Sequence, residues 1–599
     1  MSQPENQEYS IRDFLEIKSA FVSSFSPDSA SIAVISNLTG ADQAYLVSRE
    51  GGEMRQLTSG KNSVNFAAFS PTKDELIFGM SEGGNENAQL FLLGVPSGDL
   101  RQLTGRPECQ YRFGGWSRDG RYIAYAANER NGKDFDVFVR DMESGEIRTV
   151  FSQGGSCFAG GFSPSGKKLA VMVTHTPTDN DVHLVDLETG DAEHFTAHEG
   201  TALHGSPAWM PDERSFYFIT DRDRDFSGLA RYDVEGKSWK YVMTPDADVM
   251  RLSLARDGSL CAVSVNRESY TEFALYDAVS LAPVPHRDFP HGIISGARFS
   301  PDGKFLMFNF SDATRNTDAW IWSREENRFS QVTKSPCAVP RETFVEPQAF
   351  TYRSFDGLEI SAFIFMPRRA AGPVPAIINI HGGPEAQYCP GFSGMFQYFA
   401  YRGYAVVAPN VRGSTGYGKK YLSLDDIGLR MDAVRDVAEL RAHLALRGDI
   451  VPDKMALMGG SYGGYMTLAG LAFFPDLWAA GVSIVGMSNL VTFLENTAPR
   501  RRHLREAEYG SLAKDRELLE KLSPISAVDD IKAPIFFAHG ANDPRVPVSE
   551  ARQMHAALAK RGIEGPLAIY DDEGHGIGNL KNRLDLYPKI ADFLDAHLR

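Results

Sequence analysis

Cysteine is scarce in this sequence, and the few cysteines are scattered. The 599 residues contain five, namely Cys109, Cys157, Cys261, Cys337 and Cys389. No two of them have the spacing of metal ligands, and five cysteines do not build a disulfide framework for a chain of this size. The sequence therefore predicts reduced, mostly buried thiols, and we expect neither a metal nor another cofactor.

Long apolar runs, a signal peptide and an excess of positive charge are also missing. The longest apolar stretch, residues 466–486, is interrupted by Pro475 and Asp476, so it predicts a helix followed by a strand and not a membrane span. The first ten residues lack the charged and apolar regions of a signal peptide, and we expect a cytoplasmic protein. The net charge of −15 argues against a nucleic-acid partner.

The first half of the chain carries a repeat. Each unit has an apolar anchor, a turn of the Pro-Asp-Gly type and an apolar strand, and the anchors lie 44 to 47 residues apart: Phe25, Phe69, Trp116, Phe162, Trp209, Leu254 and Phe299. About four strands per 45 residues is the content of one propeller blade. We predict a seven-bladed β-propeller over residues 21–340. We also predict that residues 1–20 form a separate N-terminal segment. A short helix within 6–20 is expected to pack on the α/β domain that the second half of the chain predicts.

Prolines cluster around residues 335–350, and the repeat stops there. Beyond this point apolar strands alternate with helices, as expected of a mostly parallel sheet covered on both faces. The strands are predicted at 376–380, 404–408, 455–458, 480–485, 534–538 and 567–570, and helices at 431–446, 549–560 and 587–598. We predict one α/β domain over residues 341–599, with ligands bound beyond the carboxyl ends of its strands.

A serine stands among glycines where a predicted strand meets a predicted helix. The segment Gly459-Gly-Ser461-Tyr-Gly463 has the pattern G-x-S-x-G. Glycines flank the serine because so sharp a turn leaves no room for neighbouring side chains, and the turn presents the hydroxyl at the carboxyl end of the sheet. Ser461 is therefore predicted to be a catalytic nucleophile.

A serine hydroxyl needs a histidine base, and the histidine needs a carboxylate that fixes its tautomer. Asp543 and His575 each lie in a loop after a predicted strand, in the chain order that this arrangement requires. His381 and His539 also end strands, but a histidine there more often braces its loop. The acidic residues just before His575, at 571–573, are too close in sequence to occupy a separate loop.

The tetrahedral intermediate of acyl transfer needs two hydrogen-bond donors for its oxyanion. One is expected from the backbone of Tyr462, which follows the nucleophile. The other is expected from Gly383, in the loop His381-Gly-Gly-Pro384 after the predicted strand 376–380. Glycine lets this backbone approach the ligand closely.

These segments together resemble the prolyl oligopeptidase family of serine peptidases, and most of all its acylaminoacyl-peptidase branch. The resemblance rests on residues 381–384, 410–418, 459–464, 539–547 and 573–576. It implies an α/β-hydrolase domain capped by the propeller and acting on oligopeptides. It also implies that Ser461, Asp543 and His575 form the catalytic triad, and that Gly383 and Tyr462 supply the oxyanion donors.

Two basic sites have competing interpretations. The resemblance implies a substrate-binding role for Arg545, and the alternative is a structural ion pair that braces the acid loop. The cluster Arg500-Arg-Arg-His-Leu-Arg505 is interpreted as a solvated face, with a cavity lining that attracts peptide carboxylates as the alternative.

No paired glutamates that would anchor a free amino terminus are evident in the propeller, and Glu325-Glu326 is interpreted as a solvated turn. This puts a strict dipeptidyl-peptidase function in doubt.

These features bear on three candidate functions. The first is a peptidase that releases N-terminal residues, with or without an acyl group, from short peptides that the propeller admits. The second is a carboxylesterase on the same fold, because both reactions are acyl transfers. The third, a non-catalytic scaffold, disagrees with the complete set of site residues. The sequence leaves both a monomer and a homo-oligomer open.

Overall fold

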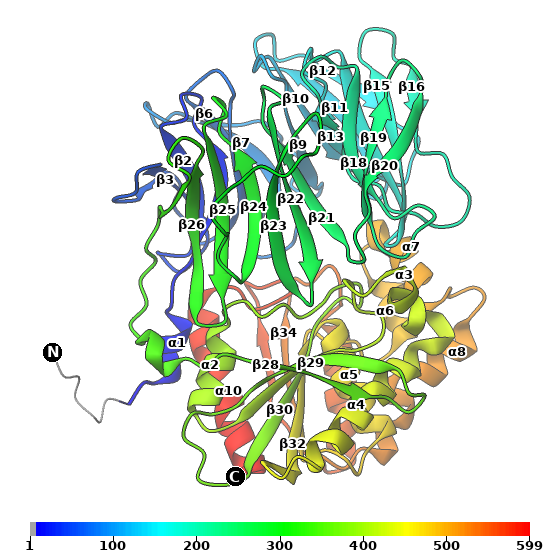
Figure 1. Ribbon diagram of the computed structural model, residues 1–599. Helices are drawn as coiled ribbons and strands as arrows, with labels where there is room; N and C mark the ends of the chain where they lie inside the picture. Colours follow the sequence, from blue (N-terminus) through cyan, green and yellow to red (C-terminus); the bar gives the residue numbers. More distant parts are fainter. Residues whose placement is uncertain (1–7) are drawn as a thin grey trace, which may run out of the picture.

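The computed structural model describes residues 8–599. The propeller lies above the α/β domain, and the two are in contact along a broad junction (Figure 1). The N-terminal helix α1 (Ile11–Leu15) lies beside α2 and α10 of the α/β domain, where Phe14 packs against Tyr398 and Tyr401. The helix predicted within 6–20 is therefore present, although residues 1–7 lie outside the described part of the chain.

Seven antiparallel sheets form the propeller, as the repeat predicts. Six of these sheets have four strands each. The sheet of blade six, β21-β22-β23, has three strands, one fewer than the repeat predicts. The first three blades contain β1 (Ala20–Phe25), β2 (Ser31–Ser36), β3 (Gln43–Ser48), β4 (Arg55–Gln56), β5 (Val64–Phe69), β6 (Glu75–Met80), β7 (Gln89–Gly94), β8 (Leu100–Gln102), β9 (Tyr111–Trp116), β10 (Tyr122–Ala127), β11 (Asp136–Asp141) and β12 (Ile147–Phe151).

The last four blades contain β13 (Ser156–Phe162), β14 (Lys168–Thr176), β15 (Asp179–Asp186), β16 (Ala192–His194), β17 (Ala208–Trp209), β18 (Ser215–Thr220), β19 (Gly228–Asp233), β20 (Ser238–Met243), β21 (Val249–Leu254), β22 (Leu260–Arg267), β23 (Tyr270–Asp277), β24 (Ile293–Phe299), β25 (Phe305–Asp312), β26 (Arg315–Ser323) and β27 (Arg328–Gln331). Each blade uses consecutive strands, and the ring closes where Val22 N donates to Asn309 Oδ1 at 2.7 Å.

The repeated turn has a repeated hydrogen bond. In the turns of blades one, three and seven a serine hydroxyl donates to the aspartate two residues later, at 2.5 to 2.6 Å: Ser26 to Asp28, Ser117 to Asp119 and Ser300 to Asp302. Such local bonds favour the turn over continued strand. The anchor motif thus marks the hairpin between the first two strands of these blades.

The α/β domain contains one eight-stranded sheet in the order β28-β29-β31-β30-β32-β33-β34-β35. Its strands are β28 (Gln348–Arg353), β29 (Glu359–Phe365), β30 (Val374–Ile380), β31 (Ala405–Asn410), β32 (Ile450–Gly460), β33 (Ala480–Ile484), β34 (Ile535–Gly540) and β35 (Leu567–Tyr570). The pairs from β31 to β35 are parallel, as predicted. The antiparallel edge strands β28 and β29 lie outside the strands that the sequence predicts.

Helices cover both faces of this sheet, and apolar side chains fill the space between the layers. One core lies between the sheet and α4, α5, α6, α8 and α9, and the other between the sheet and α1, α2 and α10. The helices are α2 (Gly394–Tyr401), α3 (Lys419–Leu422), α4 (Arg430–Ala445), α5 (Tyr462–Phe473), α6 (Leu490–Asn496), α7 (Pro499–Tyr509), α8 (Arg516–Leu522), α9 (Ser549–Lys560) and α10 (Leu580–Leu598). Among residues 8–599, no helix has the length and apolar character that crossing a bilayer requires.

Polar contacts join the propeller to the loops at the carboxyl ends of the parallel strands. Lys419 donates to the Thr201 carbonyl at 2.8 Å and pairs with Asp221 at 3.2 Å. Asn542 donates to the Gly83 carbonyl at 3.1 Å. The propeller therefore covers the end of the sheet where ligands are expected. The boundary at residues 340 and 341 stays a prediction, with β27 and β28 on either side of it.

Candidate active site

Ser461 occupies a strained turn between β32 and α5. Its φ of 57° and ψ of −117° lie outside the regions that non-glycine residues usually adopt. The two glycines of the motif have no space for a side chain: a Cβ on Gly459 would lie 2.4 Å from the Gly463 backbone, and one on Gly463 would lie 2.0 Å from the Ile380 carbonyl oxygen. The packing of the turn thus requires the G-x-S-x-G pattern.

His575 and Asp543 lie in line with this serine. The Ser461 hydroxyl is 2.9 Å from His575 Nε2, and His575 Nδ1 is 2.8 Å from Asp543 Oδ2. The two hydrogen bonds are compatible with a neutral imidazole that accepts from the serine and donates to the carboxylate. The structure thus brings together the three residues that the sequence singles out, from loops after β32, β34 and β35.

Asp543 is held as a buried carboxylate. Its Oδ1 accepts the backbone N–H groups of Arg545 at 2.8 Å and Val546 at 3.0 Å. Burial by itself would raise the pKa of Asp543, but hydrogen bonds from His539 and His575 outweigh it and hold this pKa well below its usual range. The acid therefore stays ionised, as a partner for an imidazolium requires.

The two other strand-end histidines make hydrogen bonds within their loops. His539 Nε2 donates to the Val546 carbonyl at 2.9 Å, and the His539 side chain is fully buried. His381 Nδ1 donates to the Gly382 carbonyl at 2.8 Å, and its Nε2 lies 2.9 Å from the Ser414 hydroxyl. Burial lowers the pKa of His381, which favours the neutral ring.

The residues expected to stabilise an oxyanion lie next to Ser461. A Cβ on Gly382 would lie 3.1 Å from the Gly460 carbonyl oxygen and 3.5 Å from Ser461 Cβ, so the loop that contains Gly383 packs against the serine turn. Gly383 has a φ of 140°, a conformation that favours glycine. Tyr462 is the first residue of α5, and its hydroxyl donates to Asp425 Oδ2 at 2.9 Å.

A buried ion cluster, which no pattern in the sequence predicts, supports this side of the site. The Arg430 guanidinium is fully buried and pairs with Asp425 and Glu508. Burial raises the pKa of Glu508 to about 8, against the opposing effect of Arg430. The carboxylates of Asp425, Asp426 and Glu508 lie close together, and Arg430 supplies positive charge to two of them. This cluster fixes Tyr462, the residue that follows Ser461.

Arg545 makes an ion pair with a propeller residue. Its Nε lies 2.5 Å from Glu86 Oε1, and Glu86 belongs to the loop between β6 and β7. An ion pair is one of the two roles that the sequence allows for Arg545, but its partner comes from the other domain. Glu86 was missed because its place beside Arg545 depends on how the domains dock, which no local pattern encodes.

The interpretation of residues 500–505 as a solvated face is wrong. These residues form most of α7, which lies between the α/β domain and the propeller (Figure 1). The side chains of Arg500 and Arg505 are 9% and 14% exposed. A run of charges on a helix is normally solvated, and here the docked propeller covers it.

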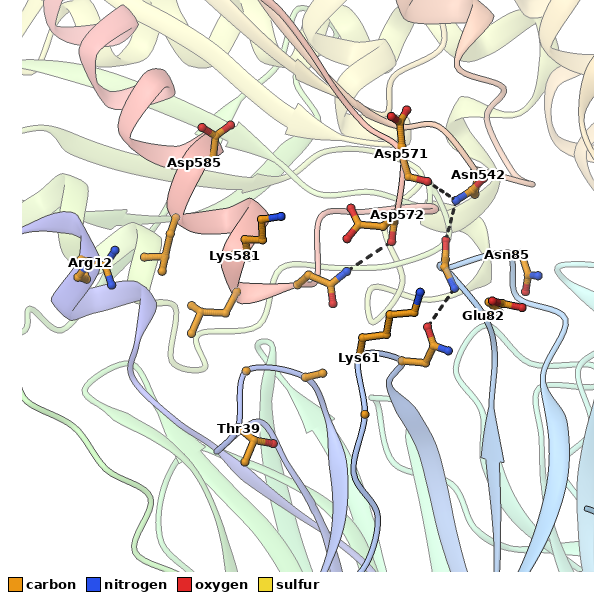
Figure 2. Close-up of a pocket in the computed structure, with 18 residues that line it drawn as sticks. Arg12, Thr39, Lys61, Glu82, Asn85, Asn542, Asp571, Asp572, Lys581 and Asp585 are labelled. Atoms are coloured by element: carbon orange, nitrogen blue, oxygen red, sulfur yellow. Dashed lines mark hydrogen bonds between the residues drawn. The ribbon is translucent and has the colours of Figure 1, made fainter. Parts of the chain in front are cut away.

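A cleft of about 1010 Å³ opens beside the site, between propeller loops and the loops after β34 and β35. Figure 2 shows Asn542 at its edge, with hydrogen bonds to the carbonyls of Gly83 and Asp571. Asn542 precedes Asp543, and Asp571 belongs to the loop of His575. Among the described residues that line the cleft, neither Ser461 nor His575 is included. The cleft therefore adjoins the candidate triad without containing it.

Three family models match parts of this chain. Residues 390–599 match the prolyl oligopeptidase family, residues 113–317 match the TolB beta propeller domain, and residues 321–429 match acetyl xylan esterase. Residues 390–599, which contain Ser461, Asp543 and His575, are thus similar to the prolyl oligopeptidase family. The prediction of a serine peptidase with a propeller and an α/β-hydrolase domain is thereby confirmed.

Relatives of two kinds match this peptidase over most of its length. Dipeptidyl aminopeptidase BIII of Pseudoxanthomonas mexicana is 28% identical over 536 residues, which are 86% of this chain and 77% of the relative. An acylamino-acid-releasing enzyme of Arabidopsis thaliana is 27% identical over 583 residues, which are 87% of this chain and 73% of the relative.

A solved structure confirms the fold of the whole peptidase chain. The structure of a puromycin-hydrolyzing peptidase of Mycobacterium tuberculosis superposes with a TM-score of 0.87 at 20% identity. The match covers 99% of this chain and 96% of the other. The arrangement of propeller and hydrolase domain is therefore shared by both proteins.

Proposed function

We propose that Ser461, His575 and Asp543 are the catalytic triad of this peptidase, and that it releases N-terminal residues, with or without an acyl group, from short peptides. The observation that carries the proposal is the pair of hydrogen bonds that links the three side chains, at 2.9 and 2.8 Å. The strained serine turn supports it, because the turn presents the hydroxyl at the end of the sheet.

The geometry fits acyl transfer. Ser461 Oγ attacks the scissile carbonyl carbon while His575 Nε2 takes its proton, and Asp543 stabilises the imidazolium. The backbone N–H groups of Gly383 and Tyr462 receive the developing oxyanion. His575 then protonates the leaving amine, and a water molecule that it activates hydrolyses the acyl-enzyme.

The docked propeller favours small substrates. It covers the carboxyl ends of the strands, so a substrate must pass between or through the two domains to reach Ser461 (Figure 1). A folded protein is too large for such a path, whereas an extended oligopeptide is not. The names of the relatives, a dipeptidyl aminopeptidase and an acylamino-acid-releasing enzyme, support cleavage near the amino terminus.

A fluorophosphonate probe and a peptide library test the proposal together. The wild type should react with the probe at Ser461 and cleave one or two residues from the amino end of library peptides, supplied with free and with acetylated termini. Ser461→Ala should lose both labelling and cleavage. Full peptide hydrolysis by Ser461→Ala would refute the triad, whereas cleavage only at internal bonds would refute the N-terminal specificity.

A carboxylesterase is the second candidate. The match of residues 321–429 to acetyl xylan esterase favours it, because this segment contains the Gly383 loop. The triad serves both reactions equally, so the substrate decides between them. We expect kcat/KM for a peptidyl p-nitroanilide to match or exceed that for p-nitrophenyl acetate, whose leaving group is the corresponding phenol. An excess of ester turnover of about 10³-fold or more, beyond the greater intrinsic reactivity of esters, would favour the esterase.

A further inference from the structure

Helix α7, which contains several arginines, extends along the candidate active site from the loop of Asp543 to the loop of Gly383. At its beginning, Ala498 N donates to the Pro544 carbonyl at 3.1 Å, and Thr497 Oγ1 donates to the Arg545 carbonyl at 2.8 Å. These bonds fix α7 to the loop of Asp543. Further along, Arg505 pairs with Glu385 at 3.4 Å, two residues beyond Gly383. The helix therefore spans the distance between the acid loop and the expected oxyanion loop.

Five arginines gather here against two glutamates. The arginine cluster comprises Arg500, Arg501 and Arg505 of α7, Arg545 of the acid loop and Arg112 of propeller strand β9. In the described part of the chain, its ion pairs are those of Glu86 with Arg545 and Arg500, and of Glu385 with Arg505. Arg501 has no ion pair or side-chain hydrogen bond among residues 8–599. Positive charge thus exceeds negative charge inside a protein whose net charge is −15.

The cluster is held at an electrostatic cost. Burial, with the neighbouring Arg500 and Arg501 adding to its effect, lowers the pKa of Arg112 to about 9. Burial, together with the nearby charges of Arg545 and Arg505, lowers the pKa of Arg501 to about 10. Buried arginines that lie close together repel one another. Unless an anion nearby offsets this repulsion, it lowers the stability of the folded protein.

Several guanidinium donors in the cluster are also unused. Within the described residues, Arg500 Nη2, Arg501 Nε and Arg505 Nε are buried and have no hydrogen-bond partner. Buried donors are normally satisfied, because each unmade hydrogen bond costs free energy. A carboxylate is the anion whose two oxygens match a guanidinium edge, and every unblocked peptide carries one.

We propose that the arginine cluster binds a carboxylate of the peptide substrate and thereby selects anionic peptides. This inference rests on the proposed function, because it names the substrate of the same site. Two carboxylates have the required chemistry: the C-terminal carboxylate of a short peptide, and the side chain of an aspartate or glutamate near the scissile bond. Glu86 occupies part of the cluster in this structure, and the substrate carboxylate fills donors that Glu86 leaves unused.

Matched peptide pairs test the inference on the wild type. One pair differs only in a C-terminal carboxylate against a C-terminal amide. The other has an amidated C-terminus and differs only in glutamate against glutamine beside the scissile bond. We expect kcat/KM to be about tenfold or more higher for the carboxylate member of at least one pair. Charge-assisted hydrogen bonds to one carboxylate contribute enough binding free energy for a difference of this size. The pair that shows the preference identifies the source of the carboxylate.

The preference should depend on the cluster. Arg501→Gln should lower the ratio of carboxylate to amide turnover about tenfold, and Arg501→Lys, which keeps the charge, should lower it less. Arg435→Gln is the matched control, since Arg435 is 52% exposed on α4 and pairs there with Asp432. It should leave the ratio unchanged. Thermal unfolding of each variant shows whether the fold is retained.

The outcomes separate this inference from the proposed function. Equal turnover of both members of both pairs by the wild type overturns carboxylate recognition while leaving the peptidase intact. An unchanged ratio in folded Arg501→Gln also overturns it. Failure of the wild type to hydrolyse any member of either pair counts against the proposed function and removes the basis of the inference with it.

Discussion

Glu86 and Arg545 are 459 positions apart in the chain and form an ion pair, with 2.5 Å between Glu86 Oε1 and Arg545 Nε. Glu86 comes from a propeller loop, and Arg545 lies two residues after Asp543. The backbone N–H of Arg545 also donates to the Asp543 carboxylate at 2.8 Å. The propeller therefore contacts the loop that holds the proposed acid, in addition to covering the site.

Glu86→Gln tests what this glutamate recognises. Its carboxylate is engaged by Arg545 and Arg500, so we expect it not to bind the amino terminus of a substrate. The ratio of kcat/KM for a free-amino peptide to that for its acetylated form should change less than about twofold in the variant. Stability should fall by about 1 kcal/mol at most, because Arg545 is 43% exposed.

A matched variant controls for the loss of one negative charge in the same loop region. Glu82→Gln removes a carboxylate from the same propeller loop, which lines the neighbouring cleft. It should leave the ratio of free-amino to acetylated turnover as it is in the wild type. If Glu86→Gln alone lowers that ratio tenfold or more, Glu86 is an amine anchor, and our assignment of it to the arginine cluster is wrong.

The propeller and the parallel sheet follow from patterns that recur along the sequence. The anchors from Phe25 to Phe299 fall before the seven inner hairpins, because a tight polar turn followed by an apolar strand repeats in each unit. Helix α9 has the predicted bounds, and β33 and β35 match to within one residue. The loops of Ser461, Asp543 and His575 were predictable because strand-end loops of one parallel sheet converge on one edge.

The remaining features depend on contacts between distant segments. The sequence around Arg430 predicts an ordinary solvated residue at the start of a helix, yet the guanidinium of Arg430 is buried between Asp425 and Glu508. The edge strands β28 and β29 follow a proline-rich segment that resembles a linker. The burial of α7 and the approach of Glu86 both arise from domain docking, for which a local charge pattern gives no signal.

Gly463→Ala tests the packing of the serine turn. The added methyl group would lie 2.0 Å from the Ile380 carbonyl oxygen, a backbone atom that cannot move without disturbing β30. We expect a loss of stability of about 3 kcal/mol and a loss of peptide hydrolysis. Unfolding in urea and kcat/KM for a peptidyl anilide measure the two effects. Gly428→Ala is the control, since its added methyl group would have no neighbour within 4 Å; unaltered activity of Gly463→Ala would contradict the expected clash.

Asp426→Asn tests the buried ion cluster through its pH dependence. Burial, with the neighbouring Asp425 adding to its effect, raises the pKa of Asp426 to about 6, whereas an aspartate in an unfolded chain titrates near about 3.9. Its contribution to stability is therefore fully present below about pH 4 and is lost as the pH rises through about 6. At pH 7 the variant should be more stable than the wild type by about 1 kcal/mol, allowing for partial exposure.

The urea midpoint between pH 4 and pH 7.5 measures this effect. The difference between Asp426→Asn and the wild type should disappear toward pH 4, where both side chains are neutral. Asp453→Asn controls for the loss of an ordinary surface carboxylate, because Asp453 is 96% exposed. Its midpoint should follow that of the wild type over the range. A variant at Asp426 that is less stable at pH 7 would show that this carboxylate is stabilising when ionised.

Asp543→Asn tests the role of the proposed acid apart from its place in the fold. The amide keeps the size of the side chain but cannot stabilise an imidazolium, and it favours the wrong tautomer of His575, so kcat should fall about 10⁴-fold. Asp571→Asn is the matched control, because Asp571 precedes His575 in the same loop and its side chain is exposed. It should retain most of the wild-type rate. Single-turnover kinetics with a peptidyl anilide measure both variants, and a fall of less than tenfold in folded Asp543→Asn would assign the acid to another carboxylate.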